Sequence, residues 1–141
     1  MVTGATVPDF VLHNENNKPY RLYDLLEKGN LLLGFPGDIW ELASIRRLLW
    51  SQREVRKLSL VNIQVAFVMP NEVTHLVNFH ISTPLPVKFP LLADPDRRVH
   101  HLFNVTYPTL MIIDRNYQLR RMWMLQDGSL PRTGDIVHAA G

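Results

Sequence analysis

Two apolar runs constrain the fold of this chain more than any other feature of its sequence: a continuous one at residues 31–35, and one at 61–69 that is interrupted only by Asn62 and Gln64. A short strand that is apolar along its whole length is typical of the buried centre of a sheet. Between the runs, residues 40–58 have the periodicity of an amphipathic helix, and Asp38 is available to cap its start. The apolar side of this helix is expected to consist of Leu42, Ile45, Leu48, Leu49 and Val55.

Shorter elements are expected on both sides of this strand–helix–strand unit. They are two strands within 8–12 and 20–22 joined by an Asn-rich turn, a helical turn over 23–27, a helix over 71–82, an apolar segment at 91–93, a helix from Pro95 to about Asn104, hairpin strands at 109–114 and 118–125, and a helix near 135–140. This order predicts an α/β fold with a central mixed sheet and helices on both faces. We expect a single domain spanning residues 1–141.

The composition is that of an ordinary globular protein, with 46% hydrophobic and 20% charged residues. A formal net charge of +2 is too small to argue for nucleic acid as a partner. The sequence shows no secretory signal and no apolar run near the roughly 18 residues of a membrane span, which predicts a soluble cytoplasmic protein. The chain contains no cysteine, which excludes disulfides, thiolate metal sites and every mechanism that uses its own cysteine.

Several segments in the same order and spacing resemble the peroxiredoxins, the alkyl hydroperoxide reductase/thiol-specific antioxidant family. The most informative is Leu-Leu-Gly-Phe-Pro-Gly-Asp at 32–38, and the others lie at 7–12, 20–25, 89–95, 104–105 and 107–114. The resemblance covers roughly residues 5 to 125. It implies a thioredoxin-like three-layer α/β/α sandwich, and thiol-dependent reduction of peroxides or disulfides as the family activity.

The resemblance also implies where the reactive groups should lie, and this sequence lacks them. Peroxiredoxins have Pro-x-x-x-Thr-x-x-Cys at the turn after residue 35, and an arginine that arrives later from a strand. Pro36 matches the proline, but Trp40 replaces the threonine, Ala43 replaces the cysteine and Pro108 replaces the arginine. An alanine methyl group cannot attack a peroxide, and Ser44 has no nearby His or Lys in the sequence to activate it.

A thioredoxin-type register fails in the same way, because Trp40 and Ala43 occupy the two positions of its Cys-x-x-Cys motif. Tyr107-Pro108-Thr109 nevertheless resembles the cis-proline loop that faces this motif and that binds extended peptide backbone in the family. We therefore expect a cis Tyr107–Pro108 bond, with an ordinary trans proline at the start of a strand as the alternative.

Two further sets of residues are candidate sites. The six histidines lack metal-binding spacing: His100 and His101 are adjacent on a helix, His75 and His80 are five positions apart, and none has an acidic partner at a useful spacing. Four residues form a stripe beside the apolar side of the long helix: Arg46, Trp50, Arg53 and Lys57. This stripe has three interpretations. It is a surface that docks a protein, a surface that binds nucleic acid, which the small net charge favours less, or a solvated face with Trp50 over the edge of the core.

The sequence therefore predicts a cysteine-less, redox-inactive relative of the peroxiredoxins that acts by binding another protein or by self-association. The expected binding residues are Trp40, Trp50, Tyr107 and Pro108. Trp40 would either fill the former active-site pocket or offer a surface, and the family resemblance suggests a homodimer contact near it. Neither a metal, a cofactor nor a membrane is implied. The alternative is a thiol-dependent antioxidant or oxidoreductase, which would need a cysteine from a partner or an unrelated nucleophile.

Overall fold

A single mixed sheet forms the centre of the molecule. The computed structural model describes residues 2–83, 87–125 and 130–141, and within these ranges the strands are β1 (Val11–His13), β2 (Pro19–Arg21), β3 (Asn30–Phe35), β4 (Ile63–Met69), β5 (Leu91–Ala93), β6 (Thr109–Ile113) and β7 (Leu119–Met124). Their order across the sheet is β2-β1-β5-β4-β3-β6-β7. The inner strands β3, β4 and β5 pair in parallel, whereas all other pairs are antiparallel.

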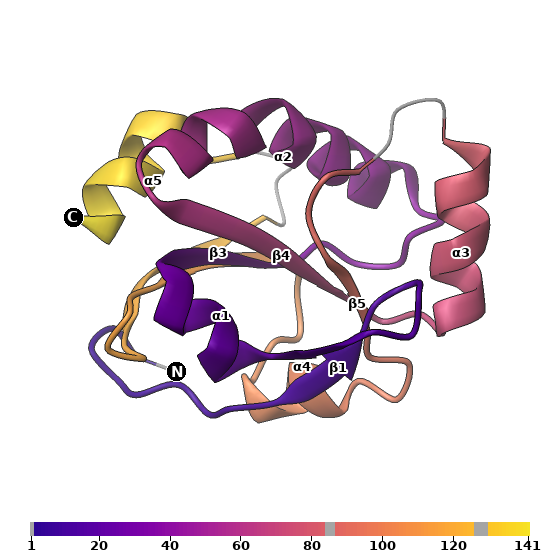
Figure 1. The fold of residues 1–141 in the computed structure, drawn as a ribbon, viewed down its shortest axis with the longest axis horizontal. Helices are drawn as coiled ribbons and strands as arrows, with labels where there is room; N and C mark the ends of the chain where they lie inside the picture. The colour runs from indigo at the N-terminus through magenta and orange to yellow at the C-terminus, as the bar shows by residue number, and fades with distance from the viewer. Residues whose placement is uncertain (1, 84–86, 126–129) are drawn as a thin grey trace.

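Helices cover both faces of this sheet, and the described ones are α1 (Leu22–Lys28), α2 (Leu42–Leu60), α3 (Val73–Ser82), α4 (Arg98–Leu102) and α5 (Thr133–Ala140). Figure 1 shows α2 and α5 above the sheet, α1 and α4 below it, and α3 at one end. In β3, Leu31 and Leu33 pack with α1 and α4, while Leu32 packs with α2, α3 and α5. Since alternate strand residues point to opposite faces, a continuous apolar run fills both cores. The expected three-layer α/β/α sandwich is confirmed.

The start of α2 differs from the sequence prediction. The helix begins at Leu42 rather than at residue 40, and Asp38 does not cap it. Instead, the Asp38 Oδ1 atom accepts a hydrogen bond of 2.9 Å from the Trp40 backbone N–H, which closes a turn ahead of the helix. Leu42 was expected on the apolar side but is 63% exposed, because it lies at the helix end beyond the edge of the core. Leu48 is buried as expected.

The start of α4 differs as well. The sequence predicted a helix that begins at Pro95, but α4 begins at Arg98. Arg97 has a left-handed backbone conformation (φ 58°), which interrupts right-handed helical geometry between Pro95 and the helix. The carboxylate of Asp94 then accepts the backbone N–H groups of Val99 and His100 at 3.2 and 3.0 Å, so it caps the helix from outside. The helix is therefore shorter than expected and its cap lies further away in sequence.

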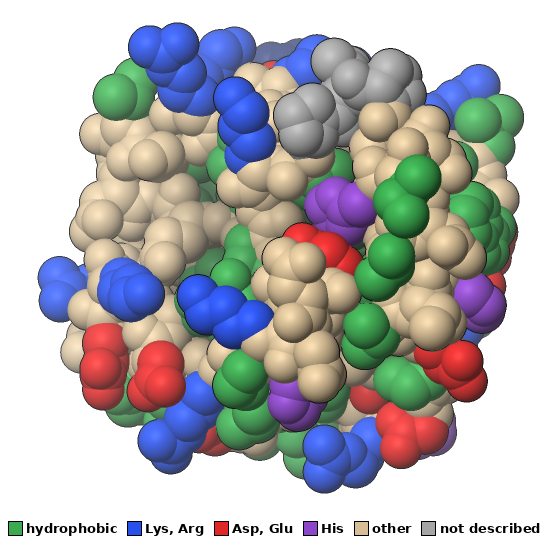
Figure 2. Space-filling model, turned by 45° about the vertical axis from the view of Figure 1, so that its right-hand side comes forward, with side chains coloured by type: hydrophobic (Ala, Val, Ile, Leu, Met, Phe, Trp, Pro, Cys, Tyr) green, Lys and Arg blue, Asp and Glu red, His purple; other side chains and the backbone are tan. Residues whose placement is uncertain are grey.

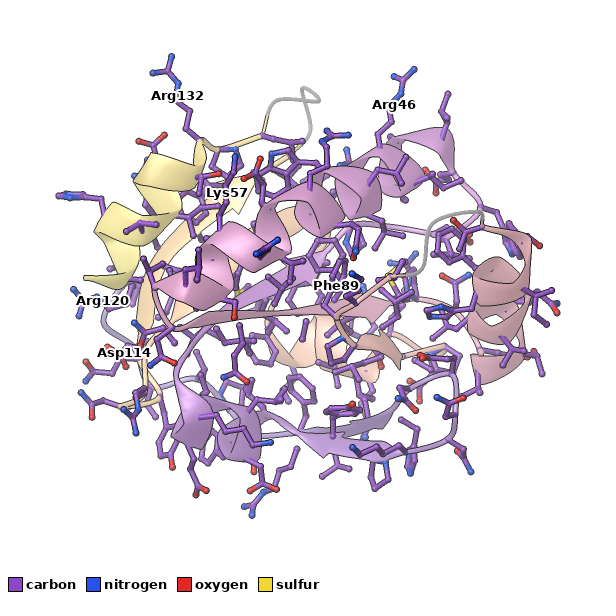
Figure 3. The ribbon with its side chains drawn as sticks, turned by 45° about the horizontal axis from the view of Figure 1, so that its top comes forward. Arg46, Lys57, Phe89, Asp114, Arg120 and Arg132 are labelled. Atoms are coloured by element: carbon purple, nitrogen blue, oxygen red, sulfur yellow. The ribbon has the colours of Figure 1, made fainter. Side chains whose placement is uncertain are left out.

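The hairpin formed by β6 and β7 follows the prediction closely. Its tight turn is held by the Asp114 carboxylate, whose Oδ1 atom accepts the backbone N–H groups of Asn116 and Gln118 at 2.9 and 3.1 Å. The Arg120 guanidinium lies 3.5 Å from the Asp114 Oδ2 atom, and Figure 3 shows both side chains at the same end of the molecule. The side chain of this aspartate therefore fixes the turn between the two strands.

Candidate binding site at the turn before α2

The turn between β3 and α2 is fixed by hydrogen bonds to the carbonyl of Pro36. The Ser44 hydroxyl donates to this carbonyl at 2.9 Å and the Arg47 Nη1 atom donates to it at 2.7 Å. Gly37 adopts φ 100°, and a Cβ atom there would lie 2.9 Å from the Ser44 Oγ atom. The turn thus needs a glycine for both its backbone conformation and its close packing.

Arg47 is a buried part of this site that sequence reasoning did not single out. Its Nη2 atom donates to the carbonyl of Leu125 at 3.1 Å, so the side chain ties the turn to the end of β7. Burial lowers the pKa of Arg47 from its usual value, and the nearby charge of Glu41 opposes that effect. Arg47 lies one position outside the cationic stripe that begins at Arg46, which is why the stripe drew attention away from it.

The residues that stand, by resemblance, at the positions of reactive groups lie at the surface. Ala43 is exposed in the first turn of α2, and Trp40 is 51% exposed with its ring edge-on to His75 at a centroid distance of 6.5 Å. Tyr107 is 50% exposed and Pro108 is half-buried beside it. Of the two roles considered for Trp40, filling the pocket is therefore wrong, because the indole turns toward α3 and solvent.

The expected cis bond between Tyr107 and Pro108 is also wrong. The structure shows no cis peptide bond in the residues that it describes, which include this pair. Trans is the intrinsically favoured isomer, and the segment forms its hydrogen bonds with it. The Thr109 hydroxyl donates to the Tyr107 carbonyl and the Leu125 N–H donates to the Pro108 carbonyl, both at 2.8 Å.

A pocket of about 160 Å³ opens between this turn, the loop at 105–108 and the start of α4. Gly37, Asp38 and Glu41 form one side of it. His100 and Arg97 contribute to the opposite side, and the remaining lining residues are Phe35, Val105, Thr106, Tyr107 and Pro108. The pocket thus borders the segments that resemble the family's active site, while Trp40 and Ala43 do not line it.

His100 and Asp94 form a buried pair at the pocket. The His100 Nδ1 atom lies 2.6 Å from the Asp94 Oδ2 atom, and the imidazole ring meets Phe35 edge-on at 5.0 Å between centroids. Burial alone would raise the pKa of Asp94, but the hydrogen bonds from the His100 ring and from the backbone of His100 and Val99 outweigh it and lower the pKa. Asp94 is therefore a carboxylate at neutral pH.

The spacing of histidines and carboxylates in the sequence does not predict this pair. From spacing alone, no histidine was expected to have an acidic partner, and the structure corrects this for His100. The two residues are six positions apart, a separation that brings side chains together only because the left-handed turn at Arg97 redirects the chain. An aspartate six residues before a histidine across a proline-containing turn is a weak signal, yet it was present.

The cationic stripe on α2 remains exposed at its charged positions. Arg46, Arg53 and Lys57 face solvent, and Figure 3 shows Arg46 pointing away from the helix. Lys57 forms an ion pair of 3.5 Å with Glu54, whereas Trp50 is half-buried against the core between α2 and the sheet. This geometry matches the alternative in which Trp50 covers the edge of the core.

Figure 2 shows the molecule with the side that carries α3 turned toward the viewer, and this face carries both charged and hydrophobic side chains. Hydrophobic side chains gather toward the right-hand part of this face, and Lys and Arg side chains lie along its edges and within its left-hand part. Among the residues that the structure describes, no group of three or more His, Asp or Glu side chains is placed to hold a metal ion. No helix within the described ranges is long and apolar enough to cross a membrane.

A model of the AhpC/TSA family matches residues 3–122 of the sequence. The chain belongs to the AhpC/TSA family. A comparison with curated proteins found no match.

Several solved structures share the fold of this chain. Peroxidoxin BcpB from Mycobacterium tuberculosis superposes with a TM-score of 0.85 at 19% identity, over 99% of this chain and 96% of that one. A putative thiol:disulfide interchange protein DsbE from Chlorobium tepidum gives 0.80 at 22% identity, over 100% and 99%. The yeast mitochondrial 1-Cys peroxiredoxin gives 0.83 at 13% identity, over 97% and 73%. At these identities the likeness establishes the fold alone.

The turn before α2 lacks the nucleophile that the AhpC/TSA resemblance implies. The position that resembles the family's cysteine is Ala43, and the chain holds no thiol elsewhere. Ser44 is fully buried and its hydroxyl donates to a backbone carbonyl, so it is not positioned as a nucleophile. What this part of the molecule offers chemically is a fixed turn, exposed aromatic side chains and a small polar pocket.

Proposed function

We propose that this chain is a redox-inactive member of the AhpC/TSA family that acts by binding a protein, with a second copy of itself as the first candidate. The observation that carries the proposal is the exposed Ala43 at the family's cysteine position, next to a turn that presents Trp40 and Leu42 to solvent. A surface that has lost its nucleophile but retains exposed aromatic groups is suited to contact rather than to chemistry.

The composition of this surface supports a protein partner. Tryptophan and tyrosine are enriched at protein interfaces, where one large, rigid side chain contributes much of the binding energy. Trp40 and Tyr107 are each about half exposed. Tyr107 lines the same pocket as Asp38 and Glu41, the neighbours of Trp40 in the turn, so both aromatic residues belong to one region of the surface.

The alternative, thiol-dependent peroxide or disulfide reduction, finds no support in these residues. A peroxidase of this family needs a thiolate, and loss of a nucleophile commonly lowers the rate by several orders of magnitude. The groups that converge on the pocket are carboxylates, an imidazole and a guanidinium, none of which supplies the two electrons that peroxide reduction consumes.

Sedimentation velocity over a wide concentration range tests the proposed self-association. We expect the wild-type protein to form a concentration-dependent dimer and Trp40→Ser to shift the equilibrium toward the monomer by at least about tenfold, as for an interface hot spot. Leu60→Ser is the matched control, because Leu60 is 81% exposed at the far end of α2. A wild-type protein that stays monomeric at every concentration would contradict self-association.

A further inference from the structure

A second pocket lies at the end of the sheet where β3 and β4 begin, away from the turn before α2. Its volume of about 300 Å³ is at the lower end of the range of small-molecule sites in proteins. Among the described residues, it shares no lining residue with the pocket beside that turn. We call it the edge pocket, and it is lined mainly by residues 62–65 and 88–90 with Leu25, Lys28, Val55 and Ser59.

The edge pocket exists because β5 covers only the second half of β4. β5 pairs with Phe67–Met69, so no described strand lies beside the beginning of β4 on that side. The chain before β5 turns away from the sheet, since the backbone N–H of Lys88 donates to the side chain of Gln52 in α2 at 2.8 Å. Figure 1 shows this segment running from β5 up toward α2. The gap that results is open to helices of both layers, because α1 and α2 each contribute lining residues.

The open edge of β4 directs a backbone donor toward the edge pocket. The N–H of Phe67 donates to the carbonyl of Pro90 at 3.0 Å, on the β5 side of the strand. Because N–H groups alternate in direction along a strand, the N–H of Val65 points to the same side, where no described strand accepts it. The Ser59 hydroxyl also forms no hydrogen bond with the described residues. These donors favour a ligand that presents acceptor atoms.

The charges of the edge pocket favour an anion. Its charged lining residues are Lys28, in the last turn of α1, and Lys88, and no aspartate or glutamate is among the described lining residues. Neither ammonium group forms a hydrogen bond or an ion pair with a described residue. A third ammonium group lies near, because the Nζ atom of Lys18 is 5.2 Å from the ring centroid of Tyr20, which also lines the pocket. Cations gathered in a concave site without counter-charges raise the local concentration of anions.

Apolar side chains supply a second kind of contact. Leu25 belongs to the core below the sheet, Val55 and Phe89 pack in the core above it, and all three line the edge pocket. We propose that the edge pocket binds a small organic carboxylate whose remaining part is apolar. The carboxylate accepts hydrogen bonds from the ammonium groups of Lys28 and Lys88, and the apolar part lies against these three side chains.

The test is a titration followed by NMR through the backbone amide of Val65. Hexanoate is the probe, and three molecules control for its parts. Hexanamide has the same chain without the charge, acetate has the charge without the chain, and hexylammonium has the opposite charge. We expect the amide resonance to shift and saturate with hexanoate at a dissociation constant on the order of 1 mM, and each control to bind at least about tenfold more weakly.

The results that would overturn the site are equally specific. They are the absence of a saturable shift with up to about 50 mM hexanoate, or an affinity for hexanamide, acetate or hexylammonium equal to that for hexanoate. The result does not depend on the proposed self-association, because Trp40 does not line the edge pocket. Failure of either proposal therefore leaves the other standing.

Two lysine variants test the position of the carboxylate without disturbing the core. Lys28 and Lys88 are both exposed, so we expect Lys28→Gln and Lys88→Gln each to weaken hexanoate binding about threefold, and the double variant about tenfold. Lys57→Gln is the matched control, because Lys57 is an exposed lysine of α2 that does not line the edge pocket, and its affinity should stay unchanged. Equal affinities of the double variant and the wild-type protein would contradict the proposed site.

Discussion

The two sides of the pocket beside the turn before α2 have different relations to the AhpC/TSA family. The turn before α2 carries Pro36, Trp40 and Ala43 at the positions that, by resemblance, correspond to the proline, threonine and cysteine of the family. The opposite side, at the start of α4, holds a buried pair of Asp94 and His100. The comparison teaches that the shape of this region is maintained by groups other than those that perform the family's chemistry.

The largest effect should come from breaking the support of the turn. Arg47→Ala removes the donors to the carbonyls of Pro36 and Leu125 and leaves a cavity, so we expect a loss of about 3 kcal/mol of unfolding free energy. Arg46→Ala is the matched control, because the side chain of Arg46 is exposed and should contribute less than about 0.5 kcal/mol to the unfolding free energy. Urea denaturation of both variants measures the difference, and similar midpoints would show that Arg47 does not support the turn.

The opposite side should respond somewhat less. Asp94→Asn takes away the negative charge from a group that accepts hydrogen bonds from the His100 ring and from two backbone N–H groups. We expect a loss of about 2 kcal/mol of unfolding free energy at neutral pH. Asp96→Asn, at an exposed aspartate in the same turn, is the control for denaturation and should change stability by less than half as much.

The pH dependence of stability sharpens this second comparison. Because the pKa of Asp94 is lower in the folded protein than its ordinary value, the unfolded state binds the proton more readily. The stabilisation is thus complete above about pH 4, the usual range of an aspartate, and is lost as the pH falls through the lowered pKa. The unfolding free energy, measured by denaturation at pH values from 6 down to 2, should decrease less steeply for Asp94→Asn than for the wild type. Parallel decreases in the two proteins would contradict this role of Asp94.

A smaller effect is expected at the glycine of the turn. Gly37→Ala places a Cβ atom 2.9 Å from the Ser44 hydroxyl in a backbone conformation of φ 100°, which should cost about 1–2 kcal/mol. Gly134→Ala is the control, because a Cβ atom there meets no neighbour within 4 Å. Thermal unfolding followed by circular dichroism compares the two, and an unchanged midpoint for Gly37→Ala would mean that the turn adapts.

Most of the fold could be predicted from the sequence because its signals are local. The apolar run of β3 contains alternate leucines that fill both cores, and the hairpin of β6 and β7 carries its own turn residues. The predicted starts of α2 and α4 were wrong, because more than one residue before each helix is of a type that can begin or cap it. Asp38 and Pro95 both fit the first turn of a helix by type, but each belongs to a turn that ends before the helix begins.

The candidate site was less accessible to sequence reasoning because its contacts join distant segments. The absence of cysteine could be read directly from the sequence, whereas the direction of the Trp40 ring depends on α3, where the ring contacts His75. Arg47 reaches Leu125 across 78 positions of the chain. The pairing of Asp94 with His100 depends on a left-handed residue between them. The expected cis bond at Pro108 was inferred from the family resemblance alone, although this chain lacks the catalytic residues that the resemblance implies.

The most direct test of the account is peroxide consumption by the purified protein. Hydrogen peroxide and an alkyl hydroperoxide are each followed with excess dithiothreitol and with a thioredoxin system, against a blank without protein and against Ala43→Cys, which places a thiol at the family's position. We expect the wild-type rate to equal the rate of the blank. Turnover by the wild-type protein well above the blank would contradict it, because the turn before α2 would then support a peroxidase mechanism that uses no cysteine of this chain.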